Sequence, residues 1–101
     1  MLELNKIRKD FKDIKYYYSR KKLFEEGYNF TGQNEIMEKV RRYGDIVITA
    51  SPKLYDLYVS LYIKNHTQAS LSDELGYTPE YIQMLNKKLL KFFQEKLTIV
   101  K

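Results

Sequence analysis

Apolar side chains recur every three or four residues along most of the chain, which is the spacing of one face of an α-helix. The first stripe comprises Ile7, Phe11, Ile14 and Tyr18. We expect this segment to be helical from about Leu4 to Glu26, because basic residues fill its other faces and Gly27 is a suitable stop. Glycine and proline are scarce, at four and two in 101 residues, so few turns are indicated. The pattern predicts an all-α protein that starts with a long N-terminal helix.

Two further apolar stripes predict the next two helices. Residues 27–34 are predicted to form a loop, followed by a helix from about Asn34 to Thr49. The stripe of this helix consists of Ile36, Met37, Val40, Tyr43 and Val47. A third helix begins after Ser51, a good N-cap, with Pro52 at its first position. Because this third helix is apolar on nearly all sides up to Ile63, we expect it to be buried at the centre of the domain.

A glycine interrupts the last helical stretch, and a new helix begins within three residues of it. Thr67 is expected to cap a short helix, and Gly76 then tolerates the left-handed backbone of a tight turn. Thr78 and Pro79 supply a new N-cap and first helical residue. Two helices joined by a short turn that contains glycine form a helix-turn-helix. We place this motif at about residues 67–93 of a small helical domain.

The two helices of such a motif need small and apolar side chains where they cross. Ser72, four residues before the glycine, is the small residue at the expected crossing. The apolar residues around the turn are expected to point back into the core of the domain. The predicted cluster comprises Leu57, Leu61, Leu71, Leu75, Ile82 and Leu85, with Tyr77 also directed inward.

The net charge is +5, from 18 Lys and Arg against 13 Asp and Glu, and the excess lies at both ends of the chain. Residues 1–30 have eight basic and five acidic side chains, and residues 79–101 have five and two, whereas residues 31–78 are slightly acidic. Basic ends favour a polyanionic partner such as nucleic acid. An ordinary solvated basic surface is the alternative. We divide the chain into a basic, aromatic helix in 1–30 and a helical domain in 31–101 that contains the helix-turn-helix.

Several classes of protein are disfavoured by what the sequence lacks. The absence of cysteine rules out a disulfide framework, a thiolate zinc site and a thiol nucleophile, and no apolar run is long enough for a membrane span. His66 is the single histidine, and adjacent acidic pairs such as Asp73 and Glu74 diverge on a helix. We therefore expect no catalytic residue, no metal site and no cofactor, in a cytoplasmic protein that is not an enzyme.

Residues 51–93, SPKLYDLYVSLYIKNHTQASLSDELGYTPEYIQMLNKKLLKFF, resemble the promoter-binding helix-turn-helix of region 4 in sigma-70 factors. The shared features are the proline-led first helix, the TQASLSDELGYT turn unit and the long basic last helix. Within that superfamily, the small size and the basic, aromatic N-terminal half resemble the phage-encoded, ArpU-type late transcriptional regulators of Gram-positive phages. The resemblance implies a DNA-binding transcriptional regulator in the host bacterial cytoplasm, with double-stranded DNA and RNA polymerase as candidate partners.

In that family the N-terminal part of the second helix enters the major groove of DNA. The resemblance implies base contacts by Glu80, Tyr81, Gln83 and Met84, phosphate contacts by Lys87, Lys88 and Lys91, and a position close to the DNA for Thr67, Gln68 and Thr78. Glu80 would accept from cytosine and Gln83 would pair with adenine, while the lysines add affinity that depends on salt. The second helix contains no arginine, the residue that most often reads guanine, so a dimer or RNA polymerase would have to assist binding.

Two questions stay open at the level of the sequence. The N-terminal stripe either packs within the chain or forms a homodimer that places two second helices one turn of DNA apart. The competing function is a protein-interaction module, in which the second helix or the N-terminal helix binds RNA polymerase or another regulator without touching DNA. Affinity for random duplex that falls steeply with salt distinguishes a DNA-binding protein from such a module.

Overall fold

The computed structural model describes residues 3–26 and 33–99 of the chain, and every regular element in these ranges is helical. The elements are α1 (Leu4–Ser19), α2 (Lys21–Glu25), α3 (Gln33–Val47), α4 (Pro52–Tyr58), the π-helix η1 (Val59–Ile63), α5 (Gln68–Leu75) and α6 (Pro79–Ile99). The all-α class and the long N-terminal helix are therefore confirmed. No described helix is long and apolar enough to cross a membrane.

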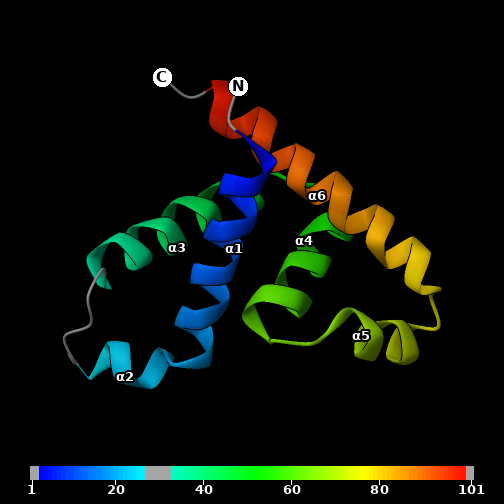
Figure 1. Cartoon of the computed structure of the whole chain (residues 1–101), viewed down its shortest axis with the longest axis horizontal. Helices are drawn as coiled ribbons and strands as arrows, with labels where there is room; N and C mark the ends of the chain where they lie inside the picture. The colour runs from blue at the N-terminus through cyan, green and yellow to red at the C-terminus, as the bar shows by residue number, and fades with distance from the viewer. Residues whose placement is uncertain (1–2, 27–32, 100–101) are drawn as a thin grey trace.

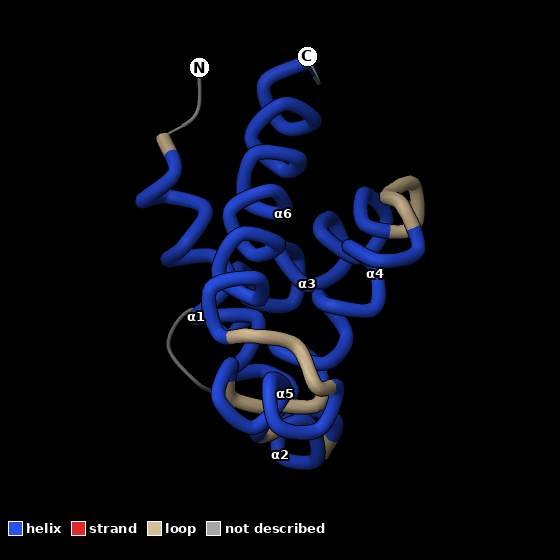
Figure 2. The backbone as a smooth tube through the Cα atoms, turned by 90° about the vertical axis from the view of Figure 1, so that its right-hand side faces the viewer, coloured by secondary structure: helices blue, strands red, loops and turns tan. Residues whose placement is uncertain are grey.

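The helices are arranged around a crossing of α1 and α6. The start of α1 and the end of α6 lie at one end of the molecule, and α2 and α5 lie at the opposite end, in both Figure 1 and Figure 2. From their crossing the two helices diverge, and α4 lies between them (Figure 1). This arrangement leaves α5 and the first turns of α6 at the side of the molecule away from α1, α2 and α3.

The core is built largely from aromatic rings that four helices contribute. Phe11 contacts the rings of Tyr43, Tyr58 and Phe93, with centroids 5.8, 6.1 and 5.4 Å away. Tyr43 and Phe93 stack at 4.8 Å. The remaining buried members of the same cluster are Ile7, Ile14, Val47, Leu57, Leu61, Leu71, Ile82, Leu85, Leu89 and Leu90. Offset and edge-to-face rings add roughly 0.5–1.5 kcal/mol per pair beyond their buried area.

The stripe of the N-terminal helix is part of this core. Ile7, Phe11 and Ile14 are buried and Tyr18 packs against the same cluster. Of the two alternatives for this stripe, the structure therefore shows the first, packing within the chain. A homodimer would have to use a different surface, because the stripe is already covered.

A buried carboxylate, which the apolar pattern gave no reason to expect, fixes α1 against α3. Asp10 is only 2% exposed, and its carboxylate accepts a 2.6 Å hydrogen bond from the Tyr43 hydroxyl. Lys6 and Lys39 lie 2.9 and 3.2 Å from the same carboxylate. Burial alone would raise the pKa of Asp10, but the Tyr43 hydrogen bond and the two ammonium groups hold that pKa below its ordinary value.

The first helix ends earlier than its pattern predicts. A single helix to Glu26 was expected, whereas α1 stops at Ser19 and α2 begins at Lys21. The Ser19 hydroxyl donates to the Tyr16 carbonyl at 2.8 Å, and Arg20 leaves helical geometry with φ −129° and ψ 30°. Serine competes with the helical backbone in this way, and three successive tyrosines are only moderate helix formers. The break lets Phe24 of α2 pack on the Tyr16 ring at 6.1 Å.

The second predicted helix is confirmed, with a shifted start and a narrower buried stripe. It begins at Gln33 rather than Asn34 and ends at Val47 rather than Thr49. Tyr43 is buried, but Met37 is 41% exposed and does not belong to the core. The predicted loop at 27–34 falls mostly on residues 27–32, which lie outside the described ranges.

The central helix is confirmed in position but differs in geometry. The Ser51 side chain accepts from the Leu54 amide and Pro52 is the first helical residue, as predicted. After Tyr58 the backbone widens into η1, whose end is marked by a hydrogen bond from the Lys64 amide to the Val59 carbonyl at 2.8 Å. The helix is also less buried than its composition predicts, because Tyr55 is exposed.

Candidate nucleic-acid interface

The turn between α5 and α6 has the geometry that its residues predict. The Thr67 hydroxyl accepts from the Ser70 amide at 3.0 Å, and the Thr78 hydroxyl accepts from the Tyr81 amide at 3.1 Å. Between these two caps, Gly76 has φ 72° and ψ 17°, in the left-handed region, and its amide donates to the Ser72 carbonyl at 2.9 Å. Two capped helices joined by a left-handed glycine form the predicted helix-turn-helix.

The inner faces of α5 and α6 pack where small and apolar residues were expected, with two exceptions. Ser72 is buried and its hydroxyl donates to the Tyr77 carbonyl, which fixes the crossing. The cluster members Leu57, Leu61, Leu71, Ile82 and Leu85 are all buried. Leu75 and Tyr77, which were predicted to point into the core, are instead 53% and 38% exposed. Both predictions were wrong, because no described element fills the space in front of the last turn of α5.

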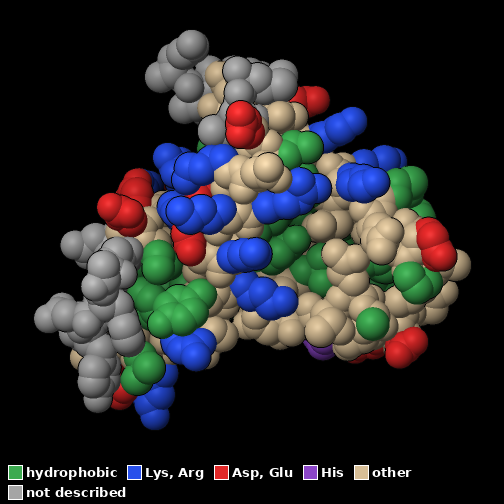
Figure 3. All heavy atoms as spheres, viewed as in Figure 1, with side chains coloured by type: hydrophobic (Ala, Val, Ile, Leu, Met, Phe, Trp, Pro, Cys, Tyr) green, Lys and Arg blue, Asp and Glu red, His purple; other side chains and the backbone are tan. Residues whose placement is uncertain are grey.

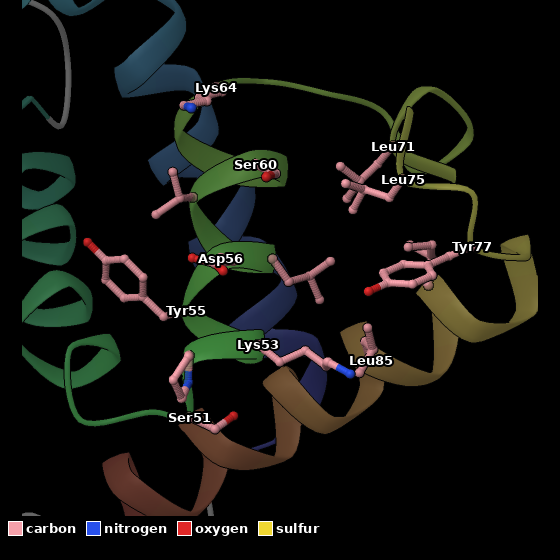
Figure 4. A pocket seen from close by; sticks show the side chains of 14 residues that line it. Ser51, Lys53, Tyr55, Asp56, Ser60, Lys64, Leu71, Leu75, Tyr77 and Leu85 are labelled. Atoms are coloured by element: carbon pink, nitrogen blue, oxygen red, sulfur yellow. The ribbon is translucent and has the colours of Figure 1, made fainter. Parts of the chain in front are cut away.

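That space is a groove of about 850 Å³ between α4, η1, α5 and the start of α6. In Figure 4 the side chains of Leu71, Leu75 and Tyr77 extend toward α4, and Lys53 reaches across from α4 toward Leu85. The groove is therefore apolar along the helix-turn-helix, with charged groups on the α4 wall. Exposed apolar surface of this kind is typical of protein-binding sites.

The outward side of α6 carries most of the residues that the sequence assigns to DNA. Glu80, Gln83, Met84, Lys87, Lys88 and Lys91 are exposed, whereas Ile82, Leu85 and Leu89 on the opposite side are buried. For these six side chains, the exposure seen in the structure agrees with the outward position predicted from the sequence. In the part of α6 between Glu80 and Glu95 every charged residue is a lysine, so this surface attracts anions.

Of the other four predicted residues, three form hydrogen bonds within the protein and Gln68 is half-buried. Tyr81 is half-buried, and its hydroxyl accepts a 2.9 Å hydrogen bond from Lys53. Thr67 and Thr78 use their hydroxyl oxygens as N-cap acceptors. A hydroxyl that accepts from an amide can still donate its own proton, so the two threonines keep the capacity to contact a phosphate.

A second hollow, of about 270 Å³, lies between α1 and α6 and was not predicted from the sequence. It is lined by Arg8, Phe11, Lys12, Lys15, Tyr62, Asn86 and Leu90. The Tyr62 hydroxyl donates to the Asn86 side-chain oxygen at 2.7 Å. Burial raises the pKa of Tyr62 to about 12, so this hydroxyl keeps its proton. The only sequence signal was the spacing of the three cations by four and three residues, which places them on one side of α1.

A metal centre has no candidate ligands in the described residues, which contain no group of three or more His, Cys, Asp or Glu side chains in position to hold an ion. His66 lies 3.9 Å from a carboxylate oxygen of Glu74, at the start of the helix-turn-helix. This separation is that of a loose surface pair, which we assign to the local structure.

Comparison with protein-family models, with curated proteins and with solved structures finds no match to this chain. The functional conclusion therefore rests on the helix-turn-helix geometry, the charge of α6 and the surfaces beside it.

Proposed function

We propose that the protein is a DNA-binding regulator of transcription that docks on promoter DNA through α6. The observation that supports this most strongly is the capped turn at Gly76, which aims the second helix outward while its inner face stays in the core. The outward face then presents amide, carboxylate and thioether side chains in its first turns and lysines in the turns that follow. Such a helix fits the major groove, which is about 12 Å wide.

The chemistry of the exposed residues suggests a division of labour along α6. Gln83 can form a bidentate pair with adenine, Glu80 can accept from the cytosine amino group, and Met84 can contact a thymine methyl. Tyr81 is the weaker base-reading candidate because Lys53 holds its hydroxyl. Lys87, Lys88 and Lys91 would neutralise phosphates, and Thr67, Gln68 and Thr78 would lie near the DNA backbone at the start of each helix.

The resemblance to region 4 of sigma-70 factors and to ArpU-type phage regulators supports a role in late phage transcription, in the cytoplasm of a bacterial host. Because α6 has no arginine, a single copy would read few base pairs. RNA polymerase is therefore proposed as an additional partner. A homodimer is the other way to add affinity, and it would have to form without the buried stripe of α1.

A protein-interaction module is the second candidate function, and the groove behind the helix-turn-helix favours it. The groove exposes Leu75 and Tyr77, its α4 wall carries Lys53 and Asp56, and Lys64 lies at one end. An amphipathic helix with charges of both signs beside its apolar face would match these groups. In this alternative the groove binds RNA polymerase or another regulator and α6 does not contact DNA.

Binding to random-sequence duplex across a salt series separates the two functions. A protein whose lysines neutralise several phosphates loses affinity steeply, with a log–log slope of about −0.9 for each phosphate. We expect a slope of about −2.7 from Lys87, Lys88 and Lys91, if each neutralises one phosphate. A folded protein that shows no duplex affinity even at low salt would be a protein-interaction module instead.

A further inference from the structure

The basic side chains on two sides of α1 differ in their partners. On the α3 side, Lys6 of α1 and Lys39 of α3 pair with Asp10 and Asp13. Arg8, Lys12 and Lys15, on the α6 side, form no ion pair with any carboxylate in the described ranges. Like charges three or four residues apart on a helix repel each other. This second group, which we call the α1 cation row, is therefore a surface that an anion would stabilise.

The opposite wall of the hollow is the helix proposed to enter DNA. Asn86 and Leu90 of α6 face the α1 cation row across the hollow. Their neighbours Lys87 and Lys91 are exposed on the same helix. Figure 3 shows Lys and Arg side chains gathered over α1 and over α6, with hydrophobic side chains visible in the hollow between them. The basic surface of α6 therefore continues across the hollow onto α1.

The π-helix η1 contributes Tyr62 to the lining of the hollow. Such turns are rare and occur frequently at functional sites, since the additional residue redirects the side chains that follow it. Here η1 carries Tyr62, whose ring lies 4.4 Å from that of Phe11. The side-chain amide oxygen of Asn86 accepts the hydrogen bond from the Tyr62 hydroxyl. The amide nitrogen of Asn86 then remains to donate to an anion in the hollow.

We propose that the α1 cation row and Asn86 form a second contact surface for the phosphate backbone of the duplex that α6 enters. This inference rests on the proposed function. Arg8 and Lys15 are seven residues apart, which is about 10 Å along a helix. One DNA strand places a phosphate every 3.4 Å along its axis, so the row faces about three phosphates.

The packing of the two helices is compatible with one duplex reaching both. Packed helices lie about 8–10 Å apart, and the wall of the major groove is about 6 Å from its centre. At the hollow, where α1 lies beside Asn86 and Leu90 of α6, α1 would therefore lie just outside a groove that holds α6, where the sugar-phosphate backbone runs. An acidic protein segment would also be attracted by the row, but it would not explain why the basic surface continues onto the outward lysines of α6.

The test compares two triple variants that remove the same charge. Arg8→Gln, Lys12→Gln and Lys15→Gln together neutralise the row. Arg42→Gln, Lys22→Gln and Lys64→Gln remove one arginine and two lysines at exposed positions that do not line the hollow. Both proteins are titrated with random duplex across a salt series, beside the wild type and Lys87→Ala, after circular dichroism has established their helicity and melting temperature.

We expect the row variant to lose about 2–3 units of log–log salt slope and the control variant to lose less than about one. Asn86→Asp gives an independent check, because it preserves the acceptor for Tyr62 while placing a negative charge in the hollow, and it should also weaken duplex binding. If the row variant and Asn86→Asp both bind duplex like the wild type while Lys87→Ala is weakened, α1 does not touch DNA and only this inference fails. If all of these proteins bind alike, the proposed function fails as well.

Discussion

Gly76 allows the stability of the turn to be tested with a magnitude taken from the structure. A Cβ atom added at Gly76 would meet no atom within 4 Å, so a larger residue is opposed only by the backbone angle, φ +72°. Left-handed geometry is unfavourable for an L-residue by about 1–2 kcal/mol, and the loss of unfolded-state freedom offsets about 0.4–1 kcal/mol of this. Gly76→Ala should therefore destabilise the protein by up to about 1.6 kcal/mol, and by about 0.8 kcal/mol at the middle of both ranges. Gly76→Val should destabilise it further, since branching at Cβ opposes this conformation.

Gly44 is the matched control for this experiment. It lies within α3, its backbone is not left-handed, and an added Cβ would likewise meet no atom within 4 Å. Gly44→Ala should stabilise the protein by about 0.5–1 kcal/mol, because alanine is the better helix former. Thermal unfolding followed by circular dichroism measures the melting temperature of both alanine variants. For a domain of this size, a change of about 1 kcal/mol in the free energy of unfolding shifts the melting temperature by about 4–8 °C. Equal shifts in the same direction for the two alanine variants would refute the assigned turn.

Three further predictions concern the core, the groove and the buried carboxylate. Leu61→Ala and Ile82→Ala should each destabilise the protein by about 2–5 kcal/mol in denaturant unfolding, and a silent substitution would contradict the packing. Leu75→Ala should cost about 1 kcal/mol or less, since the groove leaves that side chain half exposed, and a core-sized loss would contradict this. The lowered pKa of Asp10 adds stability that is present above its ordinary value of 3.8 and is lost as pH falls through the folded-state pKa. In Tyr43→Phe that acid-sensitive part should shrink, and an unchanged stability–pH curve would contradict the role of the hydrogen bond.

The helix-turn-helix could be predicted because local chemistry determines it. Thr67, Gly76 and Thr78 each meet a requirement that can be recognised in a few neighbouring residues, namely a cap, a left-handed backbone and a second cap. The buried stripe of α1 was predictable for a similar reason, since its spacing matches a helical face. What covers that stripe was left open between the chain and a second copy, and the structure shows the chain.

The features that were missed depend on contacts between distant segments. Leu75 has the apolar character of a core residue, and only the arrangement of α4 against α5 leaves it in an open groove. Asp10 has the charge of a surface residue, and its burial depends on Tyr43, 33 positions later in the chain. The hollow between α1 and α6 likewise exists only after folding, because no local pattern relates the α1 cation row to Asn86.

DNA binding by α6 can be tested by measuring the duplex affinity of Lys87→Ala and Gln83→Ala over a range of salt. Lys87→Ala should weaken all duplexes about equally and reduce the log–log salt slope by about one. Gln83→Ala should leave random duplex unaffected but lose about 1–3 kcal/mol on a site selected from a random pool. Both side chains are exposed, so both variants should keep wild-type helicity. Unchanged DNA affinity in both folded variants would contradict DNA binding by α6 and favour the protein-interaction module.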